Sequence, residues 1–403
     1  MPAILFLGAS VSQVAAIRQA RASGFRVVAV DADPDAVGFA DADAAETVDF
    51  TDIDGVLEVA CRYKIDAVVA ISTDRAVPIA AAVSERLALP GIGTETALVM
   101  TDKAAMRARL KQAAIPQPSF VVVDEHADPA WQLEAIGFPA VLKPIDSGGQ
   151  RGVYRIDDHA SLAEHLPLSL SCSRSGRAIL EQYVEGRELN GIIVAREGEP
   201  SLLTLSDRLR PPGAGFGVGW IHLYPSELEP AQLQAAGDVA VAAVRALGLR
   251  DGIAFPQLLV TDAGEVSVVE VAARIPAGQM ADLVRLGTGI DLVDIALNHA
   301  LGKPVSDAMI TARFHRPLAI SFLTASPGIL PTGTVLSIEG LDRVRTSPGV
   351  LQADSYIQIG ETIRPVQVDA DRRGYVIATA DTAGEALELA RRATHHLNVE
   401  VAR

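Results

Sequence analysis

The sequence predicts an α/β protein with a doubly wound N-terminal domain followed by α+β domains, and three observations support this. Apolar runs typical of buried strands alternate with helical patterns over the first quarter of the chain. Beyond about residue 117, short strands lie close together with glycines between several of them, and the last section mixes strands and turns before one helix. We expect domains at 1–95, 96–308 and 309–403.

Composition bounds the class of protein. The chain has 403 residues, 49% of them hydrophobic, and a formal net charge of −15. Scattered carboxylates argue against binding a phosphate backbone, so no nucleic-acid partner is expected. No uninterrupted apolar run approaches the roughly 18 residues of a membrane span, which favours a cytoplasmic protein without a membrane partner. Cys61 and Cys172 have no metal-ligand spacing, and we expect both to be buried.

The first 95 residues read as two strand–helix–strand alternations. "AILFLG" (3–8), a helix over 12–22 and "RVVAVDAD" (26–33) form the first unit, and "DAVVAIST" (66–73) is the last strand. Gly8 is followed by Ala-Ser-Val, so the second and third glycines of a dinucleotide fingerprint are missing. A structural role for this turn is favoured over cofactor binding.

Several boundaries of helices and strands can be predicted from capping and turn residues. We expect Thr101 to cap a helix over "DKAAMRARLKQAA", and Gly248 to end a long helix over 231–247. The strands "AFPQLLV" and "VSVVEV" are joined by a turn at 262–264, and Thr382 opens the last helix with a capping box.

Two segments could bind a nucleotide. "VLKPIDSGGQRGV" (141–153) places Lys143 at a strand end before Gly148 and Gly149, where backbone N–H groups can close over phosphates; a plain glycine hairpin is the alternative. "LEQYVEGREL" carries Glu181 and Glu188 around a glycine. Taken alone, this second segment is better explained as a solvated hairpin.

"VVEVAARIPAG" places Glu270 and Arg274 at the end of an apolar strand. Gln257 lies on the preceding strand and can be a cross-strand neighbour of Glu270. A hard cation such as Mg²⁺ needs one or two protein oxygens, which this pair could supply, and Arg274 would then face the same phosphates. The alternative is an exposed Glu–Arg pair, which would stabilise little.

"SDRLRPPGAGFGVGWIHLYPS" (206–226) is glycine-rich and is predicted to be a loop that acts as a lid. It brings together Arg208, Arg210, Trp220 and His222. The remaining histidines show no metal-ligand spacing and are expected at the surface or in packing: His126, His159, His165, His299, His315, His395 and His396.

The order of these motifs, with Lys103 40 positions before Lys143, resembles the ATP-grasp ligase superfamily over almost the whole chain. This implies a Rossmann-like N-terminal domain, an ATP-grasp central domain and a small α+β C-terminal domain. It also implies ATP as substrate and Mg²⁺ as cofactor, with Mn²⁺ able to replace it. The implied reaction converts a carboxylate and ATP into an acyl phosphate, which an amine then attacks.

The resemblance also implies roles for particular residues. Arg274 and His222 would be catalytic, and Gln257 and Glu270 would bind the metal. The residues implied in ATP binding are Lys103, Lys143, Gly148, Gly149, Glu181, Tyr183, Val184 and Glu188, and those implied near the substrate are Arg208, Arg210, Trp220 and Gly278.

The residue at position 272 distinguishes between branches of the superfamily. The commoner superfamily pattern is Glu-x-Asn-x-Arg, whereas this chain has Ala272 at the Asn position. Glu-x-Ala-Ala-Arg before a glycine-containing turn, and His222 before "LYP", look like the L-amino-acid ligase branch, as do "PTGTVLSIEG" and "TAGEALELARRA". Glu270 is then the single anionic ligand among the matched positions, which implies weak metal binding without nucleotide.

The resulting expectation is a ligase joining an amino acid or other carboxylate to an amine, with a homodimer expected from the resemblance alone. Two alternatives remain open: a bicarbonate- or purine-precursor ligase of the same fold, and a non-catalytic nucleotide-binding protein.

Overall fold

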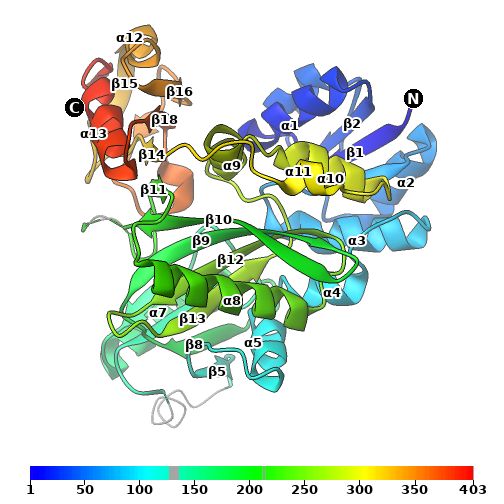
Figure 1. The fold of residues 1–403 in the computed structure, drawn as a ribbon, viewed down its shortest axis with the longest axis horizontal. Coiled ribbons are helices and arrows are strands. Elements are labelled where there is room, and N and C mark those ends of the chain that lie inside the picture. The colour runs from blue at the N-terminus through cyan, green and yellow to red at the C-terminus, as the bar shows by residue number, and fades with distance from the viewer. Residues whose placement is uncertain (127–135, 211, 214, 403) are drawn as a thin grey trace.

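The computed structural model describes residues 1–126, 136–210, 212–213 and 215–402, which form three domains around a long antiparallel sheet (Figure 1). The N-terminal domain holds a parallel sheet in the order β3-β2-β1-β4. Its elements are β1 (Ala3–Leu7), α1 (Val11–Ala22), β2 (Arg26–Asp31), β3 (Ala44–Thr47), α2 (Ile53–Tyr63), β4 (Ala67–Val69), α3 (Val77–Arg86) and α4 (Thr94–Val99).

The turn after β1 is filled by the protein's own side chains. Gly8 has a φ of 102°, and a Cβ there would meet the Gln13 side chain. The Ala9 N–H donates to the Asp31 carboxylate at 2.8 Å, and Gln13 Nε2 donates to the Ile71 carbonyl at 2.8 Å. These contacts account for the local sequence, as expected for a structural turn.

The central domain contains a smaller antiparallel sheet in the order β5-β8-β6-β7 and one half of the long sheet. The smaller sheet and its helices are α5 (Lys103–Gln112), β5 (Phe120–Val123), β6 (Ala140–Pro144), β7 (Tyr154–Ile156), α7 (His159–Ser171) and β8 (Ala178–Gln182). The long sheet takes from this domain β9 (Arg187–Arg196), β10 (Glu199–Leu209), β11 (Ile221–Tyr224), β12 (Gly252–Val260) and β13 (Val266–Ala272). Helix α8 (Pro230–Leu247) packs on one face of β9, β10, β12 and β13 and ends at Gly248, with a φ of 82°.

The long sheet continues into the C-terminal domain because β11 pairs with β14, giving the order β13-β12-β9-β10-β11-β14-β18-β16. The C-terminal elements are β14 (Leu318–Phe322), β15 (Gly333–Glu339), α12 (Leu341–Arg345), β16 (Val350–Ser355), β17 (Thr362–Ile363), β18 (Gly374–Thr379), α13 (Ala383–Thr394) and β19 (Asn398–Ala402). Strands β17, β15 and β19 form a separate small sheet, and the predicted capping box at Thr382 and Glu385 is present.

The segment after β13 returns to the N-terminal domain. Ser72 N–H donates to the Ile275 carbonyl at 3.0 Å, and α9 (Met280–Thr288), α10 (Leu292–Ala300) and α11 (Asp307–Ile310) follow. Helix α10 contacts α1, β4 and β12, so it joins the parallel sheet to the long sheet. This return brings the end of β13 against the loop after β4, and the functional site lies there.

Three local predictions are wrong: the cap at Thr101, the burial of both cysteines and the single loop over 206–226. The cap of α5 is Asp102, which accepts the Ala105 N–H at 2.9 Å, because the Thr101 hydroxyl instead donates to the Ala97 carbonyl of the preceding helix. Both cysteines are exposed. Cys61 faces solvent because α2 buries other side chains, Val56, Val59 and Ala60.

The stretch 206–226 is not a continuous loop. Its ends belong to β10 and β11, where Arg208 and His222 are cross-strand partners. The Gly215 N–H donates to the Val366 carbonyl at 3.1 Å, so the intervening segment contacts the C-terminal domain. Positions 211 and 214 of the expected lid lie outside the described residues.

Candidate active site

A row of three oxygen-bearing side chains crosses adjacent strands of the long sheet. Gln257 on β12 is paired in register with Glu270 on β13 and with Asn190 on β9. The predicted cross-strand contact of Gln257 with Glu270 is therefore confirmed. Asn190 was missed because it lies in an ordinary strand pattern, and only the sheet order places it in this row.

Asn190 is buried and only partly satisfied. Its amide nitrogen lies 3.1 Å from His222 Nδ1, whereas its Oδ1 has no hydrogen-bond partner among the described residues. Burial lowers the pKa of His222 well below its usual value, with Arg208 and Arg372 adding to the effect. His222 is therefore neutral at pH 7, and its Nδ1 can accept the Asn190 N–H.

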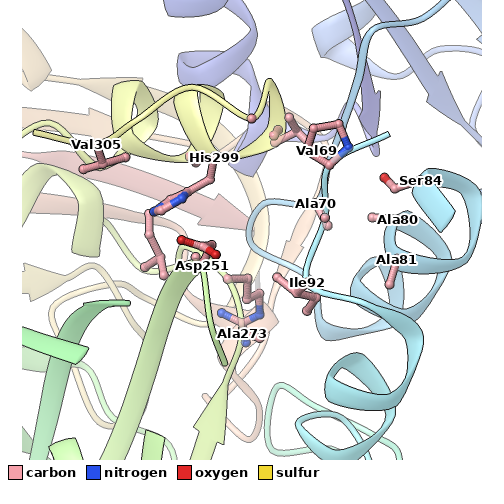
Figure 2. Close-up of a pocket in the computed structure, with 18 of the residues that line it drawn as sticks. Val69, Ala70, Ala80, Ala81, Ser84, Ile92, Asp251, Ala273, His299 and Val305 are labelled. Carbon is pink, nitrogen blue, oxygen red and sulfur yellow. The ribbon is translucent and has the colours of Figure 1, made fainter. Parts of the chain in front are cut away.

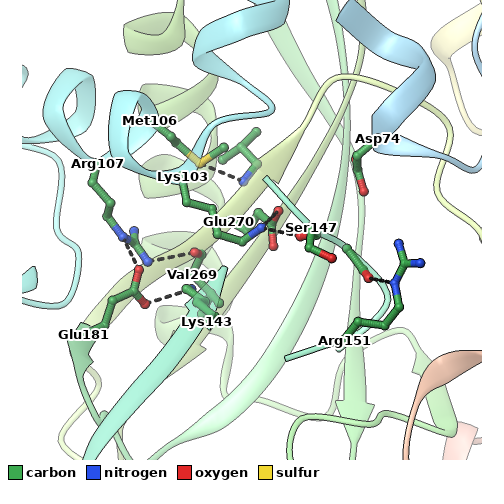
Figure 3. Close-up of polar contacts among 12 residues, drawn as sticks. Asp74, Lys103, Met106, Arg107, Lys143, Ser147, Arg151, Glu181, Val269 and Glu270 are labelled. Carbon is green, nitrogen blue, oxygen red and sulfur yellow. Dashed lines mark hydrogen bonds and ion pairs between the residues drawn. The ribbon is translucent and has the colours of Figure 1, made fainter. Parts of the chain in front are cut away.

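The two lysines come from different elements and pair with different carboxylates (Figure 3). Lys103, at the start of α5, donates to the Ser147 carbonyl at 2.8 Å and lies 3.2 Å from the Glu270 carboxylate. Lys143, on β6, lies 2.8 Å from Glu181 on β8. Burial lowers the pKa of Lys143, and Glu181 partly opposes that shift.

Glu181 neutralises two buried cations. The Glu181 oxygen that does not face Lys143 accepts the Arg107 Nε–H at 2.8 Å, and Arg107 also donates to the Val269 carbonyl (Figure 3). A further bond runs from Arg107 to the Val268 carbonyl. Burial raises the pKa of Glu181, but Arg107 and Lys143 outweigh it and lower the pKa to about 2. Arg107 was missed, although its position four residues after Lys103 places both on one helix face.

Arg274 is held by a carboxylate of the N-terminal domain. Its Nε and Nη2 both donate to Asp74 at 2.7 Å, which is a bidentate pair, and Nη1 has no partner among the described residues. Asp74 lies in the short turn Asp74–Ala76 after β4. No local signal in the sequence marks it, since the domains meet there only in the folded chain.

The glycine loop after β6 lies against the same carboxylate. A Cβ on Gly148 would come within 3.0 Å of Asp74 Oδ2, and Gly149 has a φ of 69°, which favours glycine. The glycine loop predicted within 141–153 therefore reaches the domain junction.

The arginines at the end of β10 and just after it are paired rather than free. Arg208 donates to Glu188 and to the Gly217 carbonyl, and Arg210 lies 3.4 Å from Glu188. Arg372, which was missed, enters from the C-terminal domain, with its guanidinium 4.3 Å from the Phe322 ring centroid.

The structure brings many of these residues to one cavity of about 100 Å³ and leaves others outside it. Its lining includes Asp74, Gly148, Gly149, Asn190, Arg208, His222, Gln257, Glu270, Arg274 and Arg372. Lys103 borders it through Glu270, and Lys143 lies behind with Glu181.

Nine of the predicted site residues do not line this cavity. Four of them are held in ion pairs, namely Lys103, Lys143, Glu181 and Glu188. The other five have different surroundings. Trp220 packs between two hydrophobic clusters, and its indole N–H has no partner among the described residues. Tyr183 lies 4.6 Å from the Arg155 guanidinium, with the half-buried Val184 beside it. Arg210 lies over Phe216, and Gly278 has a φ of 74° beside Phe322.

Two lysines, a glycine loop and a row of oxygen-bearing side chains, set between two antiparallel sheets, are typical of an ATP-grasp ligase. Residues 102–308, just over half of the chain, match the family model "Carbamoyl-phosphate synthase L chain, ATP binding domain". The chain belongs to this family of ADP-forming C–N ligases, whose members bind ATP with Mg²⁺. Residues 328–402 match "L-amino acid ligase C-terminal domain 2".

Known relatives and a solved structure are similar to this chain over most of its length. Uncharacterized protein y4rH of Sinorhizobium fredii is 28% identical over 396 residues, covering 96% of this chain and 80% of that protein. The L-arginine-specific L-amino acid ligase of Bacillus subtilis is 24% identical, covering 68% of this chain and 66% of that protein. The crystal structure of L-amino acid ligase from Bacillus licheniformis superimposes with a TM-score of 0.86 at 21% identity, covering 100% and 99% of the two chains, which shows the three-domain ATP-grasp fold.

Among the helices that the structure describes, none has the length and apolar character needed to cross a bilayer.

Proposed function

We propose that the protein joins the carboxylate of an amino acid to a second amine through an acyl phosphate. A carboxylate oxygen attacks the γ-phosphorus of ATP and ADP leaves; the amine nitrogen then attacks the acyl carbon, phosphate leaves and the nitrogen loses a proton. The observation that carries this proposal is that Arg274 and the row on β9, β12 and β13 line one cavity, and that Lys103 pairs with Glu270 at its edge. Phosphoryl transfer needs such charge and positioning more than a nucleophilic side chain.

The residues fit a magnesium ion. Glu270 supplies one carboxylate, Gln257 an amide oxygen, and the unpartnered Oδ1 of Asn190 an orphaned acceptor beside them. Among the described residues no group of three His, Cys, Asp or Glu side chains gathers, so the site offers little negative charge of its own. When bound with ATP, Mg²⁺ would neutralise phosphate charge, and Mn²⁺ would fit the same ligands.

The nucleotide would lie between the two sheets. We propose that Lys103 and Lys143 contact its phosphates under Gly148 and Gly149, with the backbone at Tyr183 and Val184 facing adenine. Glu181 is engaged by Arg107 and Lys143, so its proposed role is to orient Lys143. Glu188 is engaged by Arg208 and Arg210, so a contact with ribose would require exchanging one of those partners.

The cavity also carries charges suited to a zwitterionic amino acid. Arg208 and Arg372 lie on the sheet side, and Asp74 lies on the N-terminal side. We propose that the substrate ammonium takes the Asp74 carboxylate while Arg274 turns toward the transferring phosphoryl group. Neutral His222 would donate to that group from Nε2 because its Nδ1 is engaged by Asn190.

The test is ADP release measured over amino-acid pairs, single amino acids and bicarbonate. We expect at least one amino-acid pair to stimulate ADP formation and to yield a ligated product by mass spectrometry. Lys143→Ala should abolish turnover, whereas Lys111→Ala on the outer face of α5 should not. Stimulation by bicarbonate alone, or nucleotide binding without turnover in any arm, would contradict the proposal.

A further inference from the structure

Figure 2 shows a second and larger cavity, of about 860 Å³. Arg274 lines both this cavity and the site described above. The larger cavity lies where α3 and the end of β4 face the start of β12 and helix α10. Nothing in the proposed reaction uses this space. Its volume lies within the roughly 300–1,000 Å³ typical of small-molecule sites.

The cavity exists because its walls carry small apolar side chains. Ala80 and Ala81 of α3 face Ile92 and Ala273 across it (Figure 2), and Ala296 and Ala300 line it from α10. Larger residues at these positions would fill the space. The apolar walls are therefore suited to hold a hydrocarbon group.

One end of the cavity is polar and carries unused hydrogen-bonding groups. His299 Nε2 and Arg196 Nε are buried and have no hydrogen-bond partner among the described residues. Arg196 Nη1 is engaged by Asp307 at 2.7 Å and by the Val305 carbonyl at 3.2 Å, which fixes the guanidinium. A buried donor without a partner costs free energy that a ligand acceptor would recover.

Asp251 adds the opposite charge at the same end. Its Oδ1 accepts the Glu197 N–H at 2.9 Å, which orients the carboxylate. Asp251 and Arg196 both lie close enough to His299 to shift its pKa, in opposite directions, while burial lowers that pKa most. A cation, a neutral donor and a carboxylate thus share one small region beside an apolar chamber.

We propose that this cavity is a second binding site, for an apolar zwitterion such as a free amino acid or a short peptide. The ligand carboxylate accepts from Arg196 Nε and His299 Nε2, its ammonium contacts Asp251, and its apolar side chain lies against α3 and Ala273. The proposal does not depend on the reaction proposed above, because it concerns binding outside the cavity that holds Glu270 and Asn190.

The test is isothermal titration calorimetry with saturating Mg-ADP, using leucine, phenylalanine and leucyl-leucine as probes. Leucinamide and 4-methylpentanoate lack the carboxylate and the ammonium respectively, and each should bind at least tenfold more weakly than leucine. Ala80→Phe should weaken binding at least tenfold by filling the chamber. Ala82→Phe, on the same helix but outside the cavity, is the matched control and should bind as wild type.

His299→Leu is a second variant, which removes the polar donor with little change in side-chain volume and should also weaken binding. Binding that survives both Ala80→Phe and His299→Leu belongs to the cavity beside Glu270 and would overturn the proposal, as would the absence of binding by all three probes. Because calorimetry needs no turnover, failure of the ligase reaction leaves this result readable.

Discussion

Replacing Glu181 by Gln tests the buried charge cluster at the proposed nucleotide site most directly. The glutamine has nearly the same shape but leaves Arg107 and Lys143 buried without a counter-charge. The pKa of Glu181 falls from 4.5 to about 2 in the folded chain, and a shift of that size corresponds to about 3 kcal/mol of stability at pH 7. Breaking a buried pair by removing one partner typically costs about 3–5 kcal/mol, in agreement.

The sign of the pH dependence follows from the direction of the shift. Since the folded pKa is depressed, the contribution is fully present above about pH 4.5 and is lost as the pH falls toward about 2. Urea unfolding of Glu181→Gln should therefore show a loss of about 3 kcal/mol at pH 7 that shrinks at pH 3. Glu185→Gln, exposed in the same segment, is the control and should change stability by less than about 0.5 kcal/mol.

A Glu181→Gln variant within 1 kcal/mol of wild type at pH 7 would refute this reasoning. The same variant should also bind a non-hydrolysable ATP analogue more weakly, because Lys143 loses the carboxylate that orients it.

Three further predictions concern the cavity. Asn190→Ala should raise the Mg²⁺ concentration required for ADP formation roughly tenfold or more, while Asn190→Asp should lower it by adding a carboxylate; an unchanged requirement in both would exclude Asn190 as a ligand. Asp74→Asn should raise the KM for the amino acid but not for ATP, with exposed Asp35→Asn as control, and an equal rise in both constants would show a general effect on the site. Burial lowers the pKa of His222, so below about pH 6.5 the unfolded chain takes up a proton that the folded chain does not, and folding is opposed. In urea unfolding, wild type should therefore lose about 1 kcal/mol of stability per pH unit below that point, and His222→Gln should lose less. The exposed His126→Gln should follow wild type.

The sequence was informative where chemistry is local. Lys143 before Gly148, and Glu270 four residues before Arg274, are short patterns whose spacing reflects one strand and its following turn. The register of Gln257 with Glu270 followed from a tight turn between two consecutive strands. The stretch 206–226 was misread because its glycines hid two strand ends that form only by pairing with each other and with β9 and β14.

Residues contributed by distant segments could not be found from the sequence. Asp74 meets Arg274 across 200 positions because the chain after β13 returns to the N-terminal sheet. Asn190 joins the oxygen row because β9 lies between β12 and β10 in a sheet order that is not sequential.

By itself, the sequence predicted the α/β and α+β domains, because these depend on periodicity within single elements, and its motif order resembled the ATP-grasp superfamily, whose three-domain fold the structure has. It also singled out the lysines, glycines and carboxylates of the proposed site, because their spacing lies within short segments. Only the tertiary structure decided which charges are already paired, as for Glu181 and Glu188, and which polar atoms remain free, as for Asn190. The physical reason is that pairing and burial depend on contacts between elements, whose distances in space are unrelated to their separation along the chain.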